Sequence, residues 1–66
     1  MKFSKEQIRL VNDVDSWAQE NNNSADREFQ MVYCGGEGWE GVAKNHPRNF
    51  IKALDIALLH EHNYKN

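Results

Sequence analysis

The chain has 66 residues, of which 39% are hydrophobic and 27% are charged. This length excludes a dinucleotide-binding fold, a kinase and any barrel large enough to enclose a substrate, and it predicts one small domain over residues 1–66. Eight Lys and Arg residues against 10 Asp and Glu residues give a formal net charge of −2. This balance disfavours a dedicated nucleic-acid-binding protein, which usually carries a clear basic excess.

The cysteine content and the lengths of the apolar runs indicate where in the cell the protein is expected to reside. Cys34 is the one cysteine, so no disulfide can form within the chain, whereas small secreted domains usually contain several. The first residues lack the apolar stretch of a signal peptide. The longest apolar run covers residues 56–59, far short of the ~20 residues that span a bilayer. These features predict a cytoplasmic protein without membrane contact.

The first predicted element is a helix over about residues 4–21. Ser4 is a good N-cap, and Gln7, three residues later, completes the pattern of a capping box. The run of short polar side chains from Asn21 to Ser24 favours a loop after the helix. We expect Trp17 to anchor the core from this helix. The apolar residues recur at the spacing of one helix face: Ile8, Leu10, Val11, Val14, Trp17 and Ala18.

A β-hairpin is predicted over about residues 28–44. Apolar residues alternate with others from Phe29 to Cys34, as in a strand. The glycines of residues 35–38 tolerate the positive φ angles of a tight turn, and a second strand begins at Trp39. One face of this hairpin carries Phe29, Met31, Tyr33 and Val42, and the other carries Val32, Cys34, Trp39 and Ala43.

A second helix is predicted over about residues 47–61, because Pro47 suits the first position of a helix. Ile56 and Leu59 fall outside its main apolar stripe, which contains Phe50, Ile51, Ala53, Leu54, Ala57 and Leu58. The expected fold is therefore α+β, in the order α-β-β-α, with both helices packed on the Phe29 face of the hairpin.

Residues 36–41 match the pattern G-x-G-x-x-G, which in other proteins binds phosphate. Glu37 and Glu40 place two carboxylates where a phosphate would bind, and the segment is expected to lead into a strand rather than a helix. A plain turn is therefore the better interpretation, and no cofactor is expected.

Catalytic and metal-binding sites are also disfavoured. His60 and His62 lie two residues apart, so on a helix they point in nearly opposite directions, and a zinc site would need His46 or Cys34 to join them. Nothing adjacent to Cys34 in the sequence is expected to activate its thiol. A fold this small offers little of the supporting shell that catalysis needs. We expect neither an enzyme nor a metal protein.

The apolar residues left outside the expected core indicate a protein-binding surface. It consists of Val32, Cys34, Trp39, Ala43, Ile56 and Leu59. An isolated two-stranded sheet is marginal, and its open edges favour pairing into a four-stranded sheet in a homodimer. The leading hypothesis is therefore a non-enzymatic protein–protein interaction module that forms a homodimer or binds another protein. In size and expected architecture alone, the chain resembles many small phage-encoded proteins and inhibitors or regulators of host machinery.

A nucleic-acid-binding module is the alternative. Lys44, Arg48 and Lys52 can form a basic strip at the start of the second helix, and a helix N-terminus adds partial positive charge for a phosphate. The net negative charge places this alternative second.

Overall fold

The computed structural model describes residues 2–34 and 36–65, with the backbone alone for residues 62–65. Within these residues the chain forms helices α1 (Lys5–Glu20), α2 (Ala25–Val32), α3 (Gly38–Asn45) and α4 (Pro47–Lys65), and no strand. The predicted α+β fold is wrong, because helices α2 and α3 replace the two strands of the expected hairpin. A four-stranded sheet formed by dimerisation is excluded with it. Gly35, part of the expected turn, lies outside the described residues.

Helix α1 begins as the sequence predicts. The Ser4 hydroxyl accepts a hydrogen bond from the backbone N–H of Gln7, and the Gln7 side chain accepts one from the backbone N–H of Ser4. The predicted capping box is therefore confirmed. The predicted apolar stripe also faces the core, with Val11, Val14 and Ala18 fully buried.

Helix α2 forms because its apolar residues suit a helix better than a strand. Ala25 and Phe29 lie one turn apart and are both buried, and Val32 packs beside them on the same face. Met31, expected to face the core with Phe29, is instead 85% exposed. The alternation over residues 29–34 was misleading, since it arises by chance along six residues of a helix end and the loop that follows.

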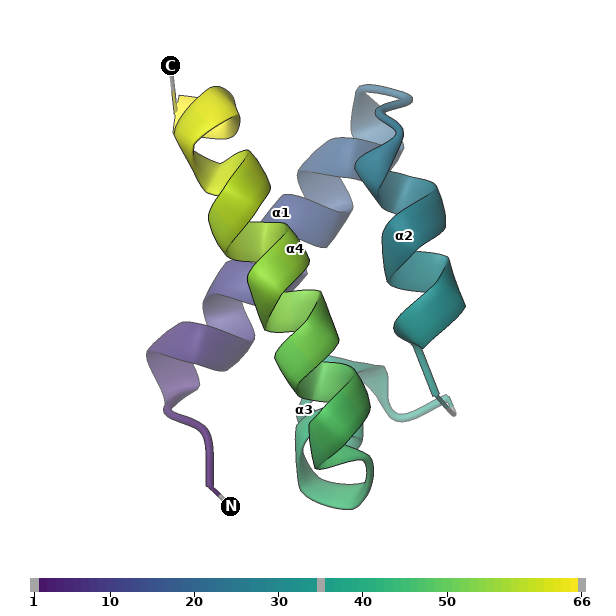
Figure 1. Cartoon of the computed structure of the whole chain (residues 1–66), viewed down its shortest axis with the longest axis vertical. Coiled ribbons are helices and arrows are strands. Elements are labelled where there is room, and N and C mark those ends of the chain that lie inside the picture. Colours follow the sequence, from purple (N-terminus) through teal and green to yellow (C-terminus); the bar gives the residue numbers. More distant parts are fainter. Residues whose placement is uncertain (1, 35, 66) are drawn as a thin grey trace.

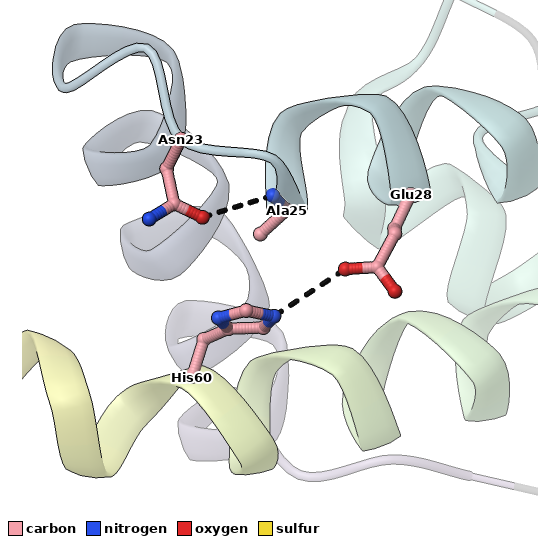
Figure 2. Close-up of polar contacts among 4 residues, drawn as sticks. All are labelled: Asn23, Ala25, Glu28 and His60. Atoms are coloured by element: carbon pink, nitrogen blue, oxygen red, sulfur yellow. Dashed lines mark hydrogen bonds and ion pairs between the residues drawn. The ribbon is translucent and has the colours of Figure 1, made fainter.

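The loop between α1 and α2 is shaped by its asparagines. Asn22 has a φ of 52°, in the left-handed region that asparagine tolerates better than most residues. The Asn23 side-chain oxygen accepts a hydrogen bond from the backbone N–H of Ala25 at 2.9 Å (Figure 2). Asn23 therefore caps the start of α2. One turn further on, Glu28 lies 3.3 Å from the His60 ring of α4, which links the two helices (Figure 2).

Helix α3 follows the glycine-rich loop. Gly38 has a φ of 78°, which glycine adopts readily because it has no side chain. The backbone N–H of Gly38 donates a hydrogen bond to the Tyr33 hydroxyl at 3.0 Å. The G-x-G-x-x-G segment thus opens a helix, contrary to the sequence prediction. Glu37 at the N-cap and Glu40 in the first turn still place two carboxylates there, which disfavours phosphate.

Helix α4 packs against the other three helices. Figure 1 shows it crossing α1, with α2 beside it and α3 next to its first turns. Phe50, Ala53 and Ala57 are fully buried, and the Phe3 ring packs on Phe50 with the ring centroids 4.5 Å apart. The expected stripe was rotated: Ile56 packs against the core, whereas Leu58 is 53% exposed.

Candidate partner-binding surface

The structure separates the six residues that the sequence grouped into a partner surface. Trp39 and Ala43 lie in the core, with the Trp39 side chain 3% exposed. Three others are partly buried against the core, and these are Val32, Cys34 and Ile56. Of the six, Leu59 alone is well exposed, at 70%. The hairpin face that was expected to carry the first four of these residues does not form, so the six make no common surface.

A different apolar surface lies on α4. Its exposed residues recur at helical spacing and share the side of the helix that faces away from Ala53 and Ala57. We call this surface the α4 outer face, and it consists of Ile51, Lys52, Asp55, Leu58 and Leu59. It combines three large aliphatic side chains with one cation and one anion, and the exposed Arg48 adjoins it one turn nearer the start of the helix.

Sequence reasoning missed this face because it assigned Ile51 and Leu58 to the core stripe. The sequence does contain a signal for a second apolar face, because apolar residues occur around most of the circumference of α4. A helix of that kind needs cover on more than one side. Met31 on α2 is a further large apolar side chain exposed to solvent.

Cys34 makes its hydrogen bonds with an amide and a carbonyl. Its sulfur accepts a hydrogen bond from Asn49 Nδ2 at 2.7 Å, and its thiol points to the Val32 carbonyl oxygen at 3.7 Å. His46 lines the same hollow of about 160 Å³, but within the described residues it makes no hydrogen bond to the thiol. The described residues also contain no group of three or more His, Cys, Asp or Glu side chains placed to hold a metal ion.

The basic residues gather at one end of the molecule. Figure 1 shows α3, the first turns of α4 and the N-terminal segment at this end. Lys5 and Arg9 line one hollow with Glu40, and Lys2 and Lys44 line an adjoining hollow that also contains Glu40. We call this surface the basic end, and it consists of Lys2, Lys5, Arg9, Lys44, Arg48 and Lys52, the last of which also belongs to the α4 outer face. The sequence indicated its last three members, all of which are exposed.

None of the described helices is both long enough and apolar enough to cross a lipid bilayer. Comparison with protein-family models, curated proteins and solved structures finds no match.

Proposed function

We propose that the protein is a non-enzymatic protein–protein interaction module, of the kind that inhibits or regulates, and that it binds through the α4 outer face. One observation carries this proposal. Leu58 and Leu59 are 53% and 70% exposed, whereas alanine and valine make up much of the buried core. Large aliphatic side chains displayed side by side on a helix are typical of a binding surface. We also place the protein in the cytoplasm, because Cys34 is a free thiol.

The partner that this face suits best is a second copy of the chain. In an antiparallel pair of α4 helices aligned so that Lys52 of each copy approaches Asp55 of the other, Ile51 lies within one helical turn of the other copy's Leu58. A parallel pair would instead bring each charge near its own kind. The face is therefore self-complementary around a two-fold axis.

Sedimentation equilibrium tests this pairing. The wild type is expected to dimerise at high micromolar concentration, and Leu59→Lys is expected to weaken the dimer by at least ~10-fold, the equivalent of ~1.4 kcal/mol. Met31→Lys is the matched control, because it makes the same kind of change at another well-exposed apolar residue, on α2. A monomeric wild type, or an equal loss in both variants, would contradict the proposal.

A charge exchange tests the orientation of the helices. Lys52→Asp and Asp55→Lys are each expected to weaken the dimer, because each brings like charges together in an antiparallel pair. The double variant restores opposite charges and is expected to recover the wild-type affinity. If the double variant is as weak as the single ones, the antiparallel arrangement is wrong.

Nucleic-acid binding is the second candidate function, and the basic end is the observation that favours it. Six cations lie there, although the whole chain has a net charge of −2. Retention on DNA at low salt is expected to fall when Lys44→Glu and Arg48→Glu are combined. A variant with the same number of charge reversals away from this end, Arg27→Glu with Lys65→Glu, is the control. If both variants lose DNA retention equally, the retention depends on net charge alone and not on the basic end.

A further inference from the structure

A hollow with both apolar and polar walls lies between the later turns of α1, the end of α2 and the start of α3, and Phe29 contributes to its apolar wall. Its volume is about 340 Å³, and no residue of α4 lines it. It is therefore distinct from the α4 outer face. The side chains that give it its chemistry are Asn12, Asp15, Gln19, Gln30, Tyr33 and Trp39. They comprise one carboxyl group, three amides and two aromatic rings, with no lysine, arginine or histidine among the residues that line it.

Asp15 is held in a fixed orientation at this hollow. Its Oδ2 accepts a hydrogen bond from Trp39 Nε1 at 2.9 Å, and its Oδ1 accepts one from Gln19 Nε2 at 3.1 Å. Trp39 is anchored in the core, and its ring packs edge-on against Phe29 and Tyr33. The carboxyl group is thus positioned before any ligand arrives, which lowers the entropic cost of binding.

The charge of Asp15 has no counter-ion in the described part of the chain. The ion pair found there joins His60 to Glu28, and both donors to Asp15 are neutral groups. Carboxylate oxygens each accept more than one hydrogen bond, so both oxygens retain acceptor capacity. Asp15 is partly buried, and removing a charge from water is costly unless the charge is paired. The hollow therefore suits a positively charged ligand.

The lining indicates which cation. The Tyr33 side chain is 39% exposed and offers an aromatic wall, while the amide oxygens of Asn12 and Gln30 are available as acceptors. A guanidinium group is planar, stacks on aromatic rings and donates several hydrogen bonds in one plane, whereas an ammonium group is a compact point charge. We propose that this hollow binds a guanidinium group through Asp15, with Tyr33 stacked against it.

Chemical shifts of the two indole N–H groups test the proposal. Trp39 hydrogen-bonds to Asp15 and reports on the hollow, and Trp17 serves as an internal reference outside its lining. Blocked arginine (N-acetyl-arginine methylamide) is expected to shift the Trp39 signal in a saturable way. Blocked lysine, with the same charge, is expected to bind at least ~10-fold more weakly. Equal responses to both compounds, or no saturation with blocked arginine, would overturn the proposal.

Two variants separate the site from general electrostatics. Asp15→Asn removes the charge but keeps an oxygen that can accept from Trp39, so the fold is expected to persist while arginine binding is lost. Asp13→Asn makes the same change on an exposed side chain of α1 outside the hollow and is expected to leave binding intact. Equal weakening in both variants would contradict a specific site. A dimer that persists while wild-type protein fails to bind blocked arginine would overturn this site and leave the α4 outer face unaffected.

Two further ligands identify the source of the guanidinium group. Free L-arginine carries an additional carboxylate and ammonium group, whereas blocked arginine imitates a side chain within a protein. Tighter binding of the blocked compound assigns the hollow to a protein's arginine side chain. Tighter binding of free L-arginine assigns it to the amino acid.

Discussion

Trp39 is buried in the core and contacts residues from two other helices. Its ring centroid lies 5.7 Å from that of Phe29 and 5.0 Å from that of Tyr33, and its N–H reaches Asp15. It thereby joins α1, α2 and α3 at one point. The sequence suggested Trp17 as the anchor, but Trp17 is only partly buried against the core.

Replacing the two tryptophans is expected to have unequal effects. Trp39→Ala is expected to cost ~3–5 kcal/mol, comparable with the whole stability of a domain this small, so the variant is expected to be largely unfolded at 25 °C. Trp17→Ala is expected to cost less, because part of its ring is already in water. Thermal unfolding followed by circular dichroism measures both. A larger loss for Trp17→Ala would show that Trp39 is not the anchor.

At Gly41, contact with Glu37 reverses the usual effect of a glycine-to-alanine substitution on helix stability. Alanine in place of a helical glycine usually adds up to ~1 kcal/mol of stability. Here an added Cβ would collide with the Cβ of Glu37, whose carboxylate accepts a hydrogen bond from Asn45 at 3.3 Å. Gly41→Ala is therefore expected to lower stability by ~1 kcal/mol or more, as overpacking does. Gly36→Ala is the control, since a Cβ added at Gly36 would meet no atom within 4 Å. A more stable Gly41→Ala variant would contradict this account.

At the scale of single elements, the short helices depend on their surroundings. Helices α2 and α3 contain 8 residues each, fewer than an isolated helix needs to be stable in water. Each packs against α4, and at the start of each a backbone N–H donates a hydrogen bond to a side chain outside the helix. Tertiary contacts therefore keep them helical.

Capping of α2 gives a test at this scale. Asn23 bonds to the backbone N–H of Ala25, whereas the Ser24 side chain makes no capping hydrogen bond although it directly precedes the helix. Asn23→Ala is expected to cost ~1 kcal/mol, and Ser24→Ala is expected to change stability by less than ~0.5 kcal/mol. Urea unfolding curves measure both values. A larger cost for Ser24→Ala would mean that the cap is assigned to the wrong residue.

At the scale of the whole molecule, charge and apolar surface are unevenly distributed. Six of the eight Lys and Arg residues belong to the basic end, while Asp13, Asp15, Glu20, Asp26 and Glu28 lie in α1 beyond its midpoint and in α2. The α4 outer face runs along the helix that contacts all the others. Net charge therefore describes this protein poorly, because half of the acidic residues lie apart from the basic end.

The topology predicts fast folding. All the helices join neighbours in the chain through short loops, and helical proteins rich in local contacts fold in microseconds to milliseconds. Refolding from urea is expected to be complete within ~10 ms, as followed by tryptophan fluorescence in a stopped-flow instrument. A dominant phase lasting seconds would contradict the simple helical topology.

Local sequence signals are sufficient to specify the first helix and the start of the last one. The capping box at Ser4 and Gln7, the apolar stripe of α1 and the start of α4 at Pro47 depend on neighbours within a few residues. Such local signals are readable without tertiary structure. The basic residues at the start of α4 were also identified from sequence, since exposure of charged side chains needs no knowledge of packing.

Packing between distant parts of the chain specifies the structure of its middle segment and of the candidate sites. Over residues 28–44 the apolar spacing satisfied both a strand and a short helix, and burial of Phe29, Trp39 and Val42 against one another and α4 favours the helix. The same packing turned α4 so that Leu58 and Leu59 face water. It also brought Asp15 to Trp39, 24 residues away in sequence. Contacts between distant residues set these features, and no local pattern encodes them.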